Sequence, residues 1–212
     1  MAARRNPDFR HVLCAADLAV ADGIGIVWAA RLLGAPVPHR IGGIDLVERV
    51  AAAASRTGLR LFLLGASEGV AAEAARRLTA CYPGLQIVGT FSGSPDPKQD
   101  DAIVAMVAQA GPDVLLVAFG APAQDLWIER NQMLLGVPVA MGVGGAFDFL
   151  SGRVSRAPLP FQRLGLEWLY RLIRQPWRWR RMLALPLFAL LVLAEAARTK
   201  GSPRTSGRGR GA

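Results

Sequence analysis

Two short segments constrain the fold of this chain most strongly. Residues 59–65 (LRLFLLG) and 113–120 (DVLLVAFG) are almost continuously apolar, and each ends in glycine. Such runs are typical of strands that are buried on both faces, as in a parallel sheet. Residues 85–93 and 137–145 are read as two further strands, and helical patterns separate all four. We therefore predict an α/β fold, with a Rossmann-like parallel sheet covered by helices on both faces.

Other segments complete the predicted order of elements. Upstream of the sheet, a short strand at 18–21 leads through a glycine-containing turn into a helix. Near the carboxyl end, the apolar run 182–194 predicts one more helix. Its 13 residues are fewer than the roughly 20 that a membrane span needs, and Pro186 interrupts it. Amphipathic helices are expected between the strands at 67–82, 101–111 (ending at Gly111) and 125–135.

Charge is distributed unevenly along the chain. Residues 1–152 hold 12 Lys+Arg and 14 Asp+Glu, whereas residues 153–212 hold 13 and 2. A basic end of this kind indicates a polyanionic partner, either nucleic acid, an anionic membrane surface or a phosphorylated substrate. We predict a Rossmann-like domain at 1–152, a basic aromatic helical appendage at 153–197 and a disordered basic tail at 198–212.

Cysteine and histidine are too few for a disulfide scaffold or an evident metal centre. Cys14 and Cys81 are expected to be two reduced, buried thiols of a cytoplasmic protein. The chain has two histidines, no Asp-x-Asp pair and no His/Cys cluster, so no metal site and no cofactor are predicted. Any diphosphate would then be held by protein cations and helix ends.

The residues at the predicted strand ends are candidates for binding, because ligands of parallel α/β sheets lie there. Gly65 allows a tight turn before a helix. This turn either helps the helix start to bind an anion or has a purely structural role. Gly120 and Pro122 shape the next loop, and Gln124 either hydrogen-bonds a ligand or belongs to the start of a helix.

A third glycine-rich strand end contains Gly144 and Gly145 and leads to Asp148, which lies between two phenylalanines. That carboxylate needs a partner, which is a backbone cap, an arginine such as Arg153 or Arg156, or a ribose hydroxyl.

Upstream of the first long strand, two acidic residues and one arginine stand beside glycine turns. Asp22, before Gly23, is either a general base or the cap of the following helix. Arg40, ahead of a Gly-Gly turn, is expected to face an anion, and Asp45 is expected to cap a helix.

Taken in order, several blocks resemble one enzyme family. They are ADGIGIVWAARLLG, RIGGIDLVERV, FLLGASEGVA, YPGLQIVG, VAFGAPAQDLWI, GVGGAFDFLSGRVSRAP and GLEWLYRLIRQPWRWRR, and they cover roughly residues 6–182. This chain is similar to the WecG/TagA/CpsF family of bacterial glycosyltransferases (glycosyltransferase family 26). The resemblance implies an inverting, metal-independent hexosyltransferase of cell-surface polysaccharide, exopolysaccharide or cell-wall biosynthesis. It would move N-acetylmannosamine, its uronic acid or a related hexose from a UDP-sugar to a polyprenyl-diphosphate-linked sugar.

The resemblance also assigns roles to residues. Asp22 is expected to be the general base, Arg40 to lie near the donor diphosphate, and Gln124 to act with them in catalysis. With the strand-end glycines, the expected nucleotide-sugar-binding set is Gly23, Gly65, Gly120, Pro122, Gln124, Gly144, Gly145 and Asp148.

The basic carboxyl-terminal segment is expected to contact the membrane and the diphosphate. Trp168, Trp177 and Trp179 favour the headgroup level, and arginines pair with lipid phosphates. The expected contacts are Arg156, Arg171, Arg174 and Arg178. The resemblance thus implies a cytoplasmic protein that is peripheral on the cytoplasmic face of the bacterial inner membrane, and a homo-oligomer is a further possibility.

Two departures from the family pattern stand out. The usual P-K-Q-E block reads P-A-Q-D here, with Ala123 and Asp125, and a lost lysine weakens anion contacts or alters donor choice. Family members also carry a strand–helix–strand with a Thr-x-Asn block before residue 6. We expect either a misassigned or truncated start, or a truncated, inactive paralogue.

Two other classes of protein compete with the glycosyltransferase. One is a basic membrane- or nucleic-acid-binding Rossmann-like protein, but the chain has no nucleic-acid recognition motif and its basic residues mix with tryptophan and leucine. No nucleic-acid partner is therefore predicted. The other is a Rossmann-type oxidoreductase, which requires a full glycine fingerprint that GASEG does not supply.

Overall fold

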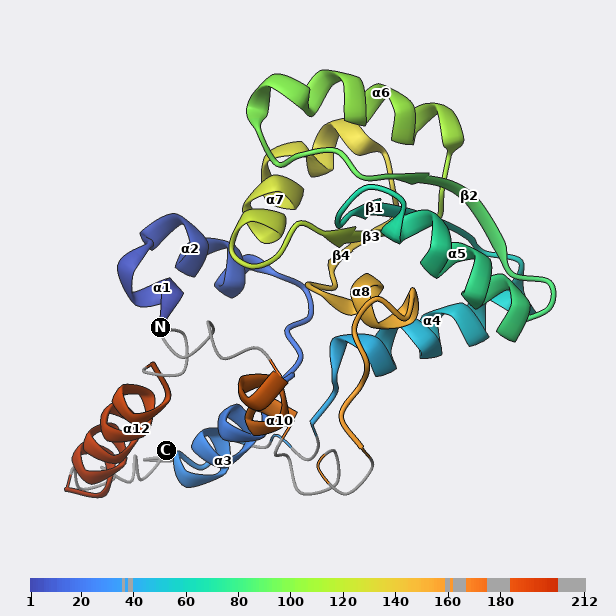
Figure 1. Cartoon of the computed structure of the whole chain (residues 1–212). Helices are drawn as coiled ribbons and strands as arrows, with labels where there is room; N and C mark the ends of the chain where they lie inside the picture. Colours follow the sequence, from blue (N-terminus) through green and yellow to red (C-terminus); the bar gives the residue numbers. More distant parts are fainter. Residues whose placement is uncertain (36, 38–39, 159–160, 162–166, 175–183, 202–212) are drawn as a thin grey trace, which may run out of the picture. The chain divides into compact units, whose positions relative to one another are not determined.

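The computed structural model describes residues 1–35, 37, 40–158, 161, 167–174 and 184–201 of the 212-residue chain (Figure 1). The chain divides into two compact units. We call residues 2–20 and 41–156 the sheet unit. We call residues 21–40 and 157–212, together with Met1, the flanking unit.

The sheet unit contains four parallel strands in the order β2-β1-β3-β4. β1 pairs with β3 in regular register, with Leu63 opposite Leu116, and Leu116 in turn faces Met141 of β4. This sheet confirms the predicted α/β class. The strands are β1 (Arg60–Gly65), β2 (Gln86–Phe91), β3 (Val114–Ala118) and β4 (Val139–Gly142).

Helices cover the sheet on both sides, as Figure 1 shows. α4 (Gly43–Thr57), α5 (Val70–Cys81) and α8 (Ala146–Leu150) pack on one face. α6 (Asp100–Ala110) and α7 (Ala123–Leu135) pack on the other. Alternate residues of β1 serve the two cores, because Leu61 and Leu63 join the first cluster while Phe62 and Leu64 join the second.

Glycines in the left-handed conformation end three of the helices at the positions that the sequence favours. α4 ends at Gly58 (φ 76°), α6 at Gly111 (φ 57°) and α7 at Gly136 (φ 61°). Only glycine adopts this conformation without a steric cost, so each helix stops there. The predicted end at Gly111 is confirmed.

The remaining described elements are short helices of the sheet unit and three helices of the flanking unit. α1 (Ala2–Arg5), α2 (Pro7–Ala15) and a 3-10 helix at Pro97–Gln99 belong to the sheet unit. α3 (Ile24–Leu32), α10 (Glu167–Arg174) and α12 (Ala184–Gly201) belong to the flanking unit. α12 confirms the apolar helix expected after Met182, and it extends to Gly201. Residues 202–212 of the predicted tail lie outside the described residues.

Three predictions differ from the structure. Residues 18–21 form no strand, and Leu18 and Val20 are exposed. β4 covers only part of the strand expected at 137–145. Both cysteines are exposed rather than buried, because Cys14 lies on a short surface helix and Cys81 at the last position of α5.

None of the helices in the described part of the chain is both long enough and apolar enough to cross a bilayer.

Candidate functional site

The strand order creates a switch point between β1 and β3. From β1 the chain continues to β2 on one side, and the later strands β3 and β4 lie on the other. In open α/β sheets the ligand crevice lies outside the carboxyl ends of the strands at such a point. Gly65 ends β1 there with φ 102°, and a Cβ on it would lie 2.8 Å from the carbonyl carbon of Ala118. Gly65 therefore lets the two strand ends approach each other.

Ala66 follows directly and carries the strain of this turn. Its φ is 63°, the one positive φ of a non-glycine residue in the described ranges. Its N–H donates to the carbonyl oxygen of Ala118 over 3.1 Å. Such conformations cost about 1–3 kcal/mol and cluster at functional sites. Sequence reasoning missed Ala66, because alanine gives no residue-type signal for a left-handed position.

Gln124 joins the two glycine-rich loops of the site. It is the second residue of α7, and only 5% of it is exposed. Its Oε1 accepts from the N–H of Gly120 over 3.1 Å and from the N–H of Gly144 over 3.0 Å. Both glycines have positive φ, and a cis peptide bond joins Ala121 to Pro122 between them. The start-of-helix interpretation thus describes where Gln124 lies, but its side chain also connects the β3–α7 loop to the β4–α8 loop.

Asp125 lies beside Gln124 against the end of β4. A Cβ on Gly142 would lie 2.4 Å from the Gln124 Nε2 and 2.9 Å from the Asp125 Oδ1, so both side chains occupy the space above that glycine. Burial raises the pKa of the Asp125 carboxyl above its usual value, and a hydrogen bond with Gln124 opposes the rise. Asp125, which stands where the family pattern has glutamate, therefore places a partly desolvated carboxyl next to the end of β4.

Asp148 lies in the short helix α8, directly after Gly144 and Gly145. It is half-buried, and its carboxylate has no hydrogen bond or ion pair within the described part of the chain. The two arginines that the sequence offered as partners do not reach it among these residues. Arg156 Nη2 instead donates to Asp45 Oδ1 over 2.6 Å. The carboxylate is thus available to a hydroxyl-bearing ligand.

The Arg156 pair also corrects the prediction for Asp45. α4 begins at Gly43 after Gly42, so Asp45 lies in its first turn rather than at its cap. The Asp45 carboxylate is still stabilised by the positive end of the helix dipole, and Arg156 adds a charge-assisted hydrogen bond. Arg156 Nε is buried without a partner in the described structure.

Asp22 and Arg40, two of the three predicted catalytic residues, belong to the flanking unit. Asp22 is exposed and precedes Gly23, which is the N-cap of α3 and makes no side-chain cap bond. The cap alternative for Asp22 is therefore wrong, and so is its predicted place at the end of a strand. Arg40 is half-buried, three residues before α4 begins.

The arginines of the basic segment are described only in part. Arg171 and Arg174 lie on α10, three positions apart. Trp168 is on the same helix, whereas Arg178, Trp177 and Trp179 lie outside the described residues.

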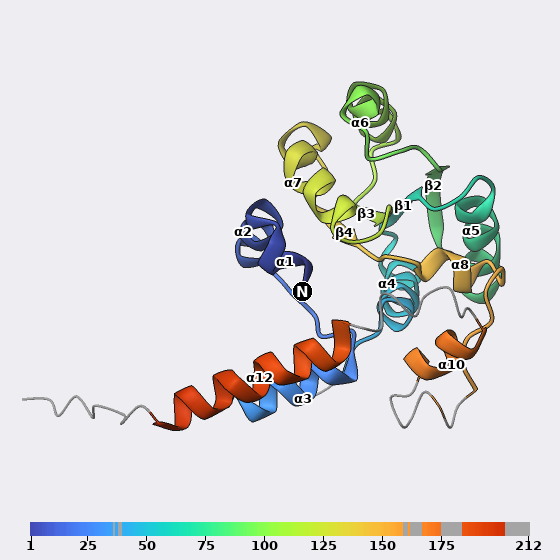
Figure 2. The same ribbon diagram turned by 60° about the vertical axis from the view of Figure 1, so that its left-hand side comes forward.

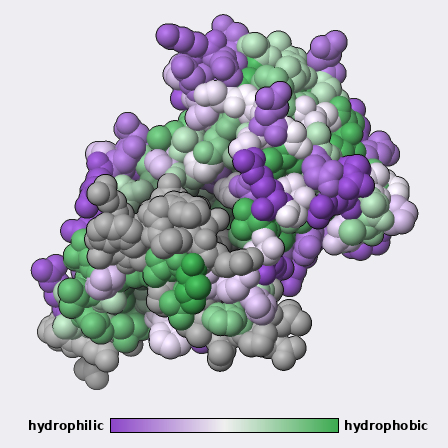
Figure 3. Space-filling model, in the orientation of Figure 1, coloured by the Kyte–Doolittle hydropathy of each residue, from purple (hydrophilic) through white to green (hydrophobic). Residues whose placement is uncertain are grey.

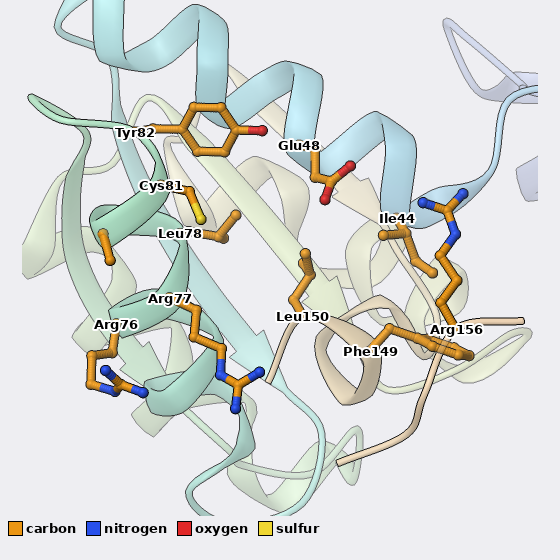
Figure 4. A pocket seen from close by; sticks show the side chains of 11 residues that line it. Ile44, Glu48, Arg76, Arg77, Leu78, Cys81, Tyr82, Phe149, Leu150 and Arg156 are labelled. Atoms are coloured by element: carbon orange, nitrogen blue, oxygen red, sulfur yellow. The ribbon is translucent and has the colours of Figure 1, made fainter. Parts of the chain in front are cut away.

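A cavity of about 490 Å³ lies elsewhere in the sheet unit, between α4, α5 and α8 (Figure 4). Its cations are already paired. Arg76 and Arg77 donate to Glu73, whose pKa these bonds lower to about 2, and Arg156 is held by Asp45. The cavity lies between helices rather than at the strand ends, and of the predicted site residues it includes Arg156, an expected diphosphate contact. It is lined by Ile44, Glu48, Arg76, Arg77, Leu78, Ala80, Cys81, Tyr82, Phe149, Leu150 and Arg156.

A hydrogen-bond network around the buried Asp100 carboxylate connects α6 with α7. The Asp100 carboxylate accepts from Trp127 Nε1 over 2.9 Å and from Arg130 Nη2 over 3.0 Å, and Arg130 also donates to the carbonyl oxygen of Pro95. The Arg130 guanidinium holds the pKa of Asp100 below its usual value. This network fixes the loop after β2 to α7, the helix that carries Gln124.

Among the described residues, no group of three or more His, Cys, Asp or Glu side chains is placed to hold a metal ion. Metal independence of the chemistry stays a prediction.

These observations first define the class of the protein: it is an α/β protein in which glycine-rich loops follow the strands on both sides of a switch point in a parallel sheet. Comparison with known proteins then shows the family. The model of the "Glycosyl transferase WecG/TagA/CpsF family" matches residues 1–202. The chain belongs to this family of glycosyltransferases.

Two curated relatives are similar over most of the chain. Both are named N-acetylglucosaminyldiphosphoundecaprenol N-acetyl-beta-D-mannosaminyltransferase. The protein from Bacillus spizizenii is 38% identical over 206 residues, which are 97% of this chain and 79% of the relative. The protein from Bacillus subtilis is 39% identical over 200 residues, which are 94% of this chain and 77% of the relative.

Proposed function

We propose that this protein transfers an N-acetylmannosamine-type sugar from a UDP-sugar to a sugar linked to a polyprenyl diphosphate, in the synthesis of a cell-surface polysaccharide. The observation that carries the proposal is the similarity, over nearly the whole chain, to relatives whose names state the transfer of N-acetyl-beta-D-mannosamine to N-acetylglucosaminyldiphosphoundecaprenol. The glycine-rich switch point supports it, because backbone N–H groups at strand ends and helix starts suit a nucleotide diphosphate.

The chemistry follows from the residue types. The Asp22 carboxylate takes the proton from the acceptor hydroxyl, whose oxygen attacks the anomeric carbon of the donor sugar. The bond between that carbon and the diphosphate oxygen breaks as the new glycosidic bond forms, with inversion. UDP leaves with the bonding electron pair, and Arg40 stabilises its growing charge. The half-buried Asp148 carboxylate accepts a hydrogen bond from a hydroxyl of the nucleotide sugar.

In this proposal Gln124 acts mainly by positioning. Its carbonyl oxygen already accepts two backbone hydrogen bonds, so it fixes the loops of Gly120 and Gly144 on which the donor would rest. Held in this way, the loops need no reorganisation when the donor binds.

The proposal is tested by incubating the full chain with a panel of UDP-sugars and an N-acetylglucosaminyl-diphospho-polyprenol. We expect a product heavier than the acceptor by one sugar residue, with release of UDP in equal amount. The UDP-sugar that yields this product identifies the donor. Binding of UDP without product from any sugar of the panel would refute transfer while leaving the nucleotide site intact.

A further inference from the structure

An ion pair lies beside two of the places at which the chain passes between its two units. Beyond its first residue, the chain crosses from one unit to the other at residues 20/21, 40/41 and 156/157. Arg156 is the last residue of the sheet unit, and Asp45 lies five positions after Arg40. The 2.6 Å bond from Arg156 Nη2 to Asp45 Oδ1 therefore joins two segments through which the sheet unit continues into the flanking unit.

The start of α4, which carries Asp45, packs closely against the end of the sheet. A Cβ on Gly43 would lie 3.1 Å from the carbonyl oxygen of Val143, directly before the glycines of the β4–α8 loop. α4 also packs beside α8 (Figure 2). The first turn of α4 is therefore a fixed point of the sheet unit, and a side chain bound to Asp45 is held there.

The segment after α8 is anchored to Asp148. The carbonyl oxygen of this residue accepts from the N–H of Val154 over 2.9 Å and from the hydroxyl of Ser151 over 3.2 Å. Between them, Gly152 has φ 77°, and a side chain on it would collide with the guanidinium of Arg77. Residues 151–154 thus form a tight turn that leads from Asp148 to Arg156.

The guanidinium of Arg156 points toward the start of α4 (Figure 4). Its Nε is buried and makes no hydrogen bond in the described structure, whereas its Nη2 binds Asp45. Arg76 and Arg77, the other arginines of the cavity, are paired with Glu73 on α5, where Figure 3 shows hydrophilic surface. They therefore do not compete for the Asp45 carboxylate.

We propose that Arg156 and Asp45 form a positioning pair, whose bond holds the connections at 40/41 and 156/157 at fixed points of the sheet unit. Arg156 acts through Asp45 in this role and needs no contact with a substrate. The role differs from the direct contact with a diphosphate that the sequence led us to expect for Arg156.

The pair matters for catalysis because the proposed function, on which this part of the inference rests, divides its reacting groups between the units. Asp22 and Arg40 belong to the flanking unit, whereas Asp148 belongs to the sheet unit. A displacement of about 1 Å between reacting groups can cost about 10²-fold in rate. Connections that leave the sheet unit at fixed points reduce such displacements.

The first measurement follows the pair without any substrate, by amide hydrogen exchange of the full chain. Arg156→Ala should accelerate exchange severalfold at Leu46 on α4, whose N–H donates to the carbonyl oxygen of Gly42 over 2.9 Å. Asp45→Ala should do the same at Val154, in the other connection. Each effect appears on the side of the unchanged partner, so the loss of a local side chain does not produce it.

The second measurement is the rate of sugar transfer at saturating donor and acceptor, in variants that circular dichroism shows to be folded. Arg156→Ala and Asp45→Ala should each lower this rate about 10-fold or more. The double variant should lose no more than either single variant, because the two residues act as one unit. Arg156→Lys should recover part of the rate, since one nitrogen makes the bond to Asp45 and an ammonium group can replace it.

Arg60→Ala is the matched control. Arg60 pairs with Asp113 over 3.4 Å, and the side chains of both pairs are partly exposed. The Arg60 pair lies at the amino ends of β1 and β3, away from the crossings between the units. Its loss should leave the exchange at Leu46 and Val154 and the transfer rate unchanged.

Three results would overturn the proposal. One is exchange at the wild-type rate at Leu46 in Arg156→Ala. Another is a full transfer rate in Asp45→Ala beside a slow Arg156→Ala, which would assign Arg156 to direct contact with a ligand. The third is a double variant in which the two losses multiply. A wild type that transfers no sugar would refute the proposed function, whereas accelerated exchange across the pair would still support the joined connections.

Discussion

Gln124 gives the sharpest test of how the site is held together. In Gln124→Ala the N–H groups of Gly120 and Gly144 lose their shared acceptor, at 3.1 and 3.0 Å. A buried donor left without a partner costs about 1–3 kcal/mol, but both glycines are partly exposed and water can replace part of each bond. We therefore expect the free energy of unfolding to fall by about 2–3 kcal/mol.

The assay is urea unfolding followed by circular dichroism, with amide hydrogen exchange at Gly120 and Gly144. Exchange at these two amides should accelerate in Gln124→Ala more than at other loop amides. Gln132→Ala is the matched control on the same helix, because Gln132 is exposed and its side chain donates one hydrogen bond, to Glu129 over 3.4 Å, within the described structure. If Gln124→Ala is as stable as Gln132→Ala and the two amides exchange at the wild-type rate, Gln124 does not hold the loops.

Two further predictions concern the frame of the site. Gly65→Ala should destabilise the protein by about 2 kcal/mol or more, because its Cβ would collide with Ala118 at φ 102°. Gly136→Ala should cost only about 1 kcal/mol, since nothing lies within 4 Å of that Cβ. Equal losses of thermal stability in the two variants would contradict the close approach of Gly65 to Ala118. The pKa of Asp100 is lowered in the folded protein, so its contribution to stability is present above the unfolded carboxyl pKa of about 4 and is lost as pH falls through the folded pKa. Asp100→Asn should therefore lower stability by about 2 kcal/mol at pH 7 and have less effect at pH 2, and urea titrations with the same loss at both pH values would refute this.

The sheet was predictable because its information is local. The apolar runs around Leu63 and Leu116 need burial on both faces, and Gly65 marks a strand end where side chains do not fit. The same reasoning failed at residues 18–21, where the sequence is apolar enough for a strand but Leu18 is 80% exposed. A strand needs a neighbour for its hydrogen bonds, and no local pattern reveals whether that neighbour exists.

The details of the site were less predictable, because they depend on distant residues. Asp45 resembled a helix cap, but Arg156, 111 positions later in the chain, binds its carboxylate. Gln124 lies at the start of α7, one of the two interpretations that the sequence allowed, yet one of its two bonds is with Gly144, 20 residues away. Ala66 carries a positive φ that only the approach of β1 to β3 imposes. Sequence patterns therefore indicated which glycine-rich loops follow the strands, whereas the contacts between these loops required the fold.

The transfer activity of Asp22→Asn, measured beside UDP binding, tests the central claim most directly. Asp17→Asn serves as control, because Asp17 is also exposed, lies five positions earlier and belongs to the sheet unit. With Asp22 as the base, the rate of sugar transfer to the lipid-linked acceptor should fall by about 10²–10⁴-fold in Asp22→Asn, with UDP affinity and the Asp17→Asn rate unchanged. A full transfer rate in Asp22→Asn would contradict the account.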